Sequence, residues 1–196
     1  MALLSGQLGV GRFRNERRMF SFPGTHTWTI PAGVTQVFAF VIGAGGGGEA
    51  YSEANSGGAG GGYAHGVISG LTPGGTITCT VGQGGNGHNN MSLGNQSDGT
   101  ASSFGSYLTG NGGAKGVYGM GSSASVSSAG GTASTSGVSE AFTATGGNGG
   151  YNDSGEQVPA AFGGGASGSP FGTPKSITIH GSSLPYKPVV MGGSGW

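Results

Sequence analysis

The chain has few charged side chains and few of the aliphatic residues that build an ordinary core. Charged residues make up 7 % of its 196 residues, and the seven basic side chains balance the seven acidic ones. Leu, Ile, Val and Phe together occupy only 34 of the 196 positions. This is about 17 %, below the roughly 20 % usual in globular chains. Disordered chains combine low hydrophobicity with high net charge. Because the net charge here is zero, we expect a folded protein with an unusual core.

Cysteines and long apolar runs are also scarce. A single cysteine, Cys79, excludes an intrachain disulfide and a multi-thiolate metal site. The longest uncharged apolar run, residues 37–42, is far shorter than the roughly 20 residues of a membrane-spanning helix, so we expect no membrane insertion. Residues 1–10 are too short and too polar for the apolar core of a secretory signal. The four histidines lack the spacing of metal ligands, and we expect neither a metal nor a cofactor.

No sequence pattern indicates catalysis. Residues 43–48 match the dinucleotide-binding pattern G-x-G-x-x-G, but that site needs a helix directly afterwards, and residues 49–62 have little helical character. No nucleophile elbow and no suggestive pair of carboxylates is present. Cys79 alternates with Ile77 and Val81, which is typical of a small buried residue. We predict that the protein is not an enzyme.

Residues 1–18 differ from the rest of the chain, because they hold four of its seven basic side chains. We predict that this segment is an arm that attaches the protein to a partner. The predicted attachment residues are Arg12, Phe13, Arg14, Arg17 and Arg18. A merely solvated arm and a nucleic-acid contact are the alternatives. Four arginines beside Glu16 in a neutral chain are a weak nucleic-acid footprint, and we expect no nucleic-acid partner.

Residues 19–82 are typical of β-structure. The clearest strand is 76–81, where Ile77, Cys79 and Val81 alternate with threonines. Residues 37–42 are apolar at every position, as in a strand covered on both faces. Further strands are expected at 26–30 and 63–69.

Residues 83–196 consist mostly of small residues, and the chain as a whole holds 49 glycines. Each interior glycine costs a helix about 1 kcal/mol, so helix is disfavoured. Glycines spaced two or three apart let polyproline-II helices approach until their backbone groups pair. We therefore predict an all-β fold in which a β-sandwich-like part carries a polyglycine helix bundle, without substantial α-helix. Residues 19–196 then form one folded unit, with a short strand at 176–180.

Isolated large side chains stand among these glycines. They either fill gaps at the edge of the bundle or stand on loops as rigid contact groups. We predict the second role for Tyr118, Met120, Tyr151 and Asn152.

An ordered series of motifs carries a family resemblance. Phe22-Pro23-Gly24-Thr25 leads to Trp28 and Pro31-Ala32-Gly33, and the glycines of 43–48 and 57–62 follow, ending at Tyr63. This order resembles the glycine-rich domain of phage and prophage tail fibre proteins. The series continues at 71–74, 81–87, 103–106, 145–150 and 163–168, so that the resemblance covers about residues 20–172.

The resemblance implies a virion protein at a tail fibre or tail tip. Tail-tip adhesins of the T-even type also stack polyglycine helices and present variable loops from one end. Receptor binding is then expected, to a host surface glycan or an outer-membrane protein. The N-terminal arm would bind other tail proteins, and a homo-oligomer is expected, with a trimer favoured. The alternatives are a purely structural fibre connector or head-decorating fibre, and a bacterial surface adhesin.

Overall fold

Ten strands form two antiparallel sheets in the computed structural model of the chain. The structure describes residues 2–8, 17–49, 56–87, 95–117, 128–150 and 167–170, and only the backbone of 2–8. The strands are β1 (Ala2–Leu8), β2 (Arg17–Phe20), β3 (Gly24–Thr29), β4 (Val34–Ile42), β5 (Tyr63–Ser69), β6 (Thr76–Val81), β7 (Ser102–Phe104), β8 (Leu108–Gly110), β9 (Ala133–Thr135) and β10 (Ser139–Ala144). The described residues contain no helix, and the predicted all-β class is confirmed.

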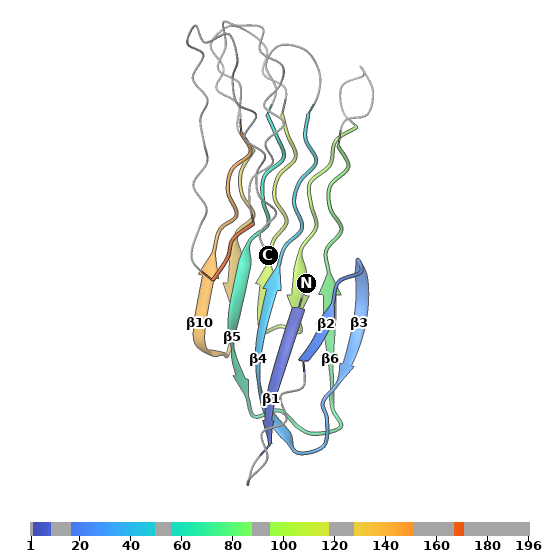
Figure 1. Ribbon diagram of the computed structural model, residues 1–196, viewed down its shortest axis with the longest axis vertical. Helices are drawn as coiled ribbons and strands as arrows, with labels where there is room; N and C mark the ends of the chain where they lie inside the picture. Colours follow the sequence, from blue (N-terminus) through green and yellow to red (C-terminus); the bar gives the residue numbers. More distant parts are fainter. Residues whose placement is uncertain are drawn as a thin grey trace, which may run out of the picture.

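The two sheets pack face to face as a sandwich (Figure 1). The first sheet has the order β10-β5-β4-β1-β2, and the second has the order β3-β6-β7-β8-β9. The chain passes between the sheets at both sides of the sandwich, from β2 to β3 and from β9 to β10. The predicted strands 63–69 and 76–81 match β5 and β6, while β4 begins three residues before the predicted 37–42 and β3 lies at Gly24–Thr29 instead of 26–30.

The core lies between the sheets and follows from the alternation of the strands. In β4, Val37, Ala39 and Val41 are at most 1 % exposed. Trp28 of β3 and Phe104 of β7 fill the other side, with ring centroids 5.9 Å apart. The outward side chains of β4 are only half-buried, so this strand is not fully covered on both faces as its composition predicted.

Residues of the predicted N-terminal arm take part in the first sheet. Strand β1 lies between β4 and β2 and pairs antiparallel with both. Arg17 and Arg18 open β2 at the edge of this sheet. Deletion of residues 1–18 would therefore remove one interior strand and shorten the edge strand.

Beyond the strands, extended segments continue in one direction as a bundle (Figure 1). We call this bundle the glycine lattice. Each of its segments adjoins one strand, at the end opposite the turns that join β3 to β4 and β5 to β6. The segments are 43–49, 56–62, 82–87, 95–101, 111–117, 128–132 and 145–150.

Backbone hydrogen bonds join these segments with a three-residue period. Three amides of 43–49, spaced three apart, donate to three carbonyls of 56–62 with the same spacing. The pairs are Gly43 N with Gly62 O (2.8 Å), Gly46 N with Ala59 O (2.9 Å) and Glu49 N with Ser56 O (3.2 Å). Amides of Ala44 and Gly47 donate instead to the 95–101 segment. A three-residue period is that of the polyproline-II helix, in agreement with the predicted polyglycine bundle.

Glycine is required where these segments touch. A Cβ atom at Gly46 would overlap the carbonyl of Ala114, and one at Gly47 would overlap the carbonyl of Asn86. Gly45 lies on a different side of the same helix, where the nearest atom to an added Cβ, the carbonyl oxygen of Ala59, is 3.5 Å away. At these glycines the segments therefore touch through backbone atoms.

This difference predicts opposite outcomes for adjacent glycines. Gly46→Ala should lower the free energy of unfolding by about 3 kcal/mol, because an extra carbon in a packed interior forces the backbone apart. Gly45→Ala should change it by less than about 1 kcal/mol, since the carbon fits there. Urea denaturation of the two variants makes the comparison. Equal stabilities would show that the segments do not approach as described.

Candidate functional site

The described parts of several lattice segments reach the same level, at the side farthest from the turns that join β3 to β4 and β5 to β6 (Figure 1). We define this distal end by Glu49, Ser56, Val117, Ser128 and Gly150. The Ser56 amide donates to the carbonyl of Val117 at 3.1 Å. Gly57, next to Ser56, donates to the Gly150 carbonyl at 2.8 Å. Five segments therefore present their last described residues side by side.

Buried hydroxyls fix the distal end. The Val117 amide donates to Oγ of Ser56 at 2.8 Å, and the Ser128 hydroxyl donates to the carbonyl of Gly57. Both serines are at most 2 % exposed. A few residues nearer the strands, the Asp98 carboxylate accepts the Lys115 amide at 2.8 Å. Side chains thus complete the backbone pairing where the glycine pattern gives way to other residues.

The predicted contact residues follow directly on the distal end. Tyr118, Met120, Tyr151 and Asn152 lie outside the described residues. Their chain neighbours Val117 and Gly150 belong to the distal end.

The predicted attachment residues divide in the same way. Arg12, Phe13 and Arg14 lie outside the described residues, while Arg17 and Arg18 are exposed on β2. Two exposed apolar side chains accompany them, Met19 at 54 % and Phe22 at 79 % exposure. A basic and apolar strip therefore runs along the β2 edge, remote from the distal end.

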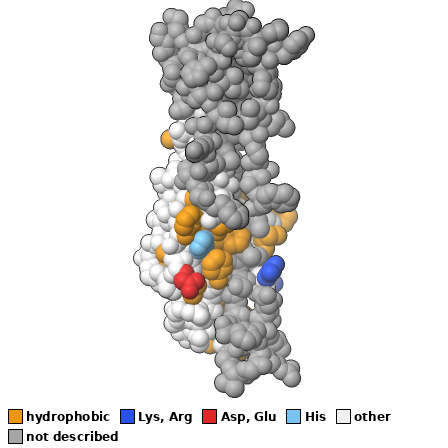
Figure 2. Space-filling model, turned by 60° about the vertical axis from the view of Figure 1, so that its left-hand side comes forward, with side chains coloured by type: hydrophobic (Ala, Val, Ile, Leu, Met, Phe, Trp, Pro, Cys, Tyr) orange, Lys and Arg blue, Asp and Glu red, His pale blue; other side chains and the backbone are white. Residues whose placement is uncertain are grey.

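The outer face of the first sheet carries a line of rings, which we call the aromatic row: Phe40, His65 and Phe142. These residues lie directly opposite one another on β4, β5 and β10. The rings of His65 and Phe142 stack with centroids 5.3 Å apart, and Phe38 lies 5.3 Å from His65 on its other side. Figure 2 shows hydrophobic side chains gathered around one histidine on this face.

The environment of His65 favours its neutral form. Partial burial lowers the pKa of His65, and the nearby negative charge of Glu140 acts in the opposite direction. Nδ1 of His65 lies 3.1 Å from the hydroxyl of Tyr63, whose pKa is raised by burial. Glu140 has a φ of 49°, a left-handed conformation uncommon for glutamate, at a point where the pairing of β10 with β5 shifts register.

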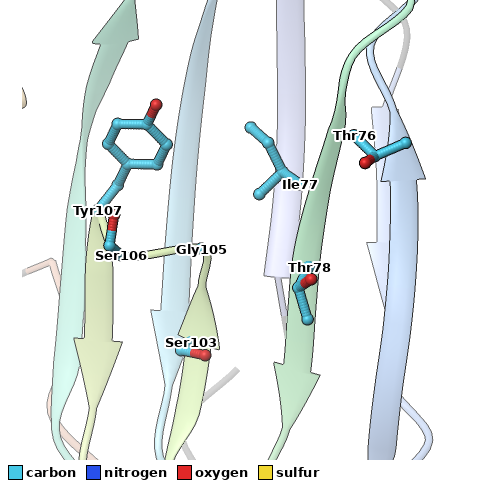
Figure 3. A pocket seen from close by; sticks show the side chains of 7 residues that line it. All are labelled: Thr76, Ile77, Thr78, Ser103, Gly105, Ser106 and Tyr107. Carbon is cyan, nitrogen blue, oxygen red and sulfur yellow. The ribbon is translucent and has the colours of Figure 1, made fainter.

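A shallow depression of about 500 Å³ lies on the second sheet. Figure 3 shows Thr76, Ile77 and Thr78 of β6 on one side of it, and Ser103 and the Gly105–Tyr107 turn on the other. Its lining offers hydroxyl groups and an aliphatic surface but no carboxylate, imidazole or amine. Such a lining can hydrogen-bond a ligand but supplies no proton donor or acceptor that works near neutral pH.

The remaining chemical candidates are structural. Cys79 is fully buried, and burial raises its pKa to about 11, so it is a core residue and not a nucleophile. The glycines of 43–48 continue into the lattice and not into a helix. Among the described residues, no group of three His, Cys, Asp or Glu side chains could hold a metal ion. No helix in the described ranges is long and apolar enough to cross a membrane.

Sequence analysis missed the aromatic row. Its signal was the fully apolar run 37–42, whose second apolar face we attributed to a covering layer. The alternation of Tyr63, His65 and Val67 in β5 was a second signal, because register sets these residues opposite Ile42, Phe40 and Phe38. Only the pairing of β4 with β5 shows that the two patterns share one outward face.

The pKa of His65 predicts a pH dependence of stability. The pKa of His65 is lower in the folded protein than in the unfolded chain. Below the ordinary histidine pKa of about 6.5, the unfolded chain therefore binds more protons than the folded protein does. Stability is therefore complete above that pH and falls as the pH drops through it. Melting temperatures measured from pH 7.5 to 5.5 should decline, and His65→Gln should flatten the decline. His26→Gln, the matched control on β3, should retain it; equal slopes in all three proteins would contradict the assignment to His65.

Comparison with known proteins assigns the chain to a family. A search of the curated proteins finds no match. A family model described as a glycine-rich domain matches residues 21–196, which is nearly the whole chain. The matched region contains β3 to β10 and every segment of the glycine lattice. The chain therefore belongs to the glycine-rich domain family.

Proposed function

We propose that the protein is a non-catalytic component of a phage tail fibre or tail tip, and that it binds the host surface through chain segments carried on the distal end. The observation that supports this proposal most strongly is the gathering of five lattice segments at Glu49, Ser56, Val117, Ser128 and Gly150. A rigid scaffold that carries connecting segments at one end is a common arrangement of binding proteins.

In the proposed function, the lattice residues must stay constant, whereas the segments that connect them can vary. Segments 50–55, 88–94 and 118–127 are joined at both ends to lattice residues near the distal end. For example, Ser97 donates to the Asn86 carbonyl at 3.1 Å on the two sides of 88–94. We expect substitutions in these connections to leave the described backbone pairing intact. A protein that must follow changes in a host receptor benefits from this separation.

Three further features support the proposal. The ordered motif series resembles that of tail fibre proteins, and the chain belongs to the glycine-rich domain family. The exposed strip of Arg17, Arg18, Met19 and Phe22 offers a second surface, remote from the distal end, to other tail proteins. A host surface glycan or an outer-membrane protein would bind at the distal end, with Tyr118 and Tyr151 as aromatic anchors.

We infer that the protein works by binding and not by catalysis. The burial and raised pKa of Cys79 and the hydroxyl lining of the depression on the second sheet support this inference. The half-buried aromatic row on the outer face of the first sheet favours one other role, that of a purely structural fibre part, because apolar patches at a protein surface commonly mark interfaces. The two roles differ in what the distal end contributes.

Substitution of the predicted anchors tests the proposal. Tyr118→Ala combined with Tyr151→Ala should weaken binding of the purified, fluorescently labelled protein to a susceptible bacterial strain about 1,000-fold, or about 30-fold for each anchor. Loss of an aromatic anchor costs an interface about 2 kcal/mol or more. The melting temperature should stay unchanged if the two rings act as contact groups and not as packing groups.

Phe22→Ala is the matched control, since it removes an exposed ring beside β2. It should leave cell binding unchanged. If the double variant binds cells as well as the parent protein but assembles poorly with isolated tails, the distal end is structural and the receptor-binding role is wrong.

A further inference from the structure

The outer face of the first sheet carries apolar side chains on β10, β5, β4 and β2. Phe142, His65 and Phe40 are directly opposite one another on β10, β5 and β4. The same row continues through β1 to Met19 of β2, because Leu3 pairs with both Phe40 and Met19. Met19 is 54 % exposed. In a two-sheet sandwich an outward face is ordinarily polar, so these apolar side chains call for a partner.

The neighbouring row ends in opposite charges. Ser5 of β1 pairs with Arg17 of β2 and with Phe38 of β4. Val67 of β5 then pairs with Phe38 and with Ser139 of β10. Arg17 therefore stands at the β2 edge and Glu140, next to Ser139, at the β10 edge, at the same height along the strands. Figure 2 shows a basic and an acidic side chain on opposite sides of the hydrophobic group. Both residues are exposed.

This arrangement is complementary to itself. A two-fold axis parallel to the strands, passing over the central strand β4, would set Arg17 of one copy opposite Glu140 of the other, twice. A two-fold axis across the strands would instead set each charge opposite its own like charge. We propose that the outer face of the first sheet is a homodimer interface, formed face to face with the strands of the two copies running in the same direction.

A second copy explains the surface better than a ring of copies does. A cyclic ring joins two different patches of each molecule, so a ring joined through Arg17 and Glu140 would use the edges of the sheet and leave the aromatic row exposed. The face-to-face dimer covers the row and pairs both charges. Its two glycine lattices point the same way, so the two distal ends would lie side by side. This inference goes beyond the proposed function and holds whatever the distal end binds; in the dimer, Arg18 and Phe22 are the residues of the β2 strip that stay available to other tail proteins.

Charge reversal tests the interface with the full-length protein. Sedimentation velocity should show a dimer of the parent chain, and Arg17→Glu or Glu140→Arg alone should weaken dimerisation about tenfold, since like charges then face each other. The double variant Arg17→Glu with Glu140→Arg should regain dimerisation to within about threefold of the parent, because the pairs are restored in reverse. Thr78→Glu, a charge added on the outer face of the second sheet, should have no effect. A monomeric or trimeric parent chain, or a double variant no better than the single ones, would overturn the proposal.

A cross-link tests the symmetry. Gln36 is exposed on the outward side of β4, near the proposed axis. Gln36→Cys should form a disulfide-linked dimer on mild oxidation, because each cysteine meets its own copy across the axis. Cys79 is buried and contributes no background. If Gln36→Cys cross-links no faster than Thr78→Cys, the two faces do not meet in the proposed orientation.

Discussion

The hydrogen bond between backbone groups of neighbouring polyglycine segments is the interaction on which this molecule depends. In an ordinary core, side chains fill the space between elements. Here the amide of Gly46 donates directly to the carbonyl of Ala59 on the neighbouring segment. An ordered glycine loses more conformational entropy than any other residue. Each segment must therefore bond to several neighbours at once, and the amides of 43–49 do so by alternating between two partners along the helix.

The sandwich makes that lattice achievable. Its strands bring seven chain segments into parallel alignment before the glycines begin, and the apolar contacts of Trp28, Phe104 and Val37 stabilise the alignment. The lattice then extends this alignment to the distal end without side-chain packing. The result is a scaffold whose form is set by backbone geometry. In the proposed function, binding at the distal end and assembly at the sheet surface would then change independently.

Much of the fold was predictable, and the reasons are physical. The alternation of threonine with apolar residues in 76–81 determines which face of that strand is buried. The spacing of the glycines disfavours helix and allows backbone groups of neighbouring segments to pair. The aromatic row was not predictable, because the partners of Phe40 depend on how distant strands pair. The place of β1 inside the first sheet was hidden for the same reason. The contact roles of Tyr118 and Tyr151 are predicted from composition alone, and the structure adds only the position of their neighbours Val117 and Gly150.

Amide hydrogen exchange, followed residue by residue, tests the central claim most directly. If the lattice is held by interhelical backbone bonds, the amides of Gly46, Gly60 and Gly113 should exchange as slowly as those of β4 and β5, although no large apolar side chain of the described residues packs between the segments. Protection should also follow the three-residue pattern, with the amide of Gly45, which donates to no backbone carbonyl of the described residues, exchanging faster than that of Gly46. Exchange of the whole lattice within seconds, beside a protected sandwich, would contradict a core made of backbone.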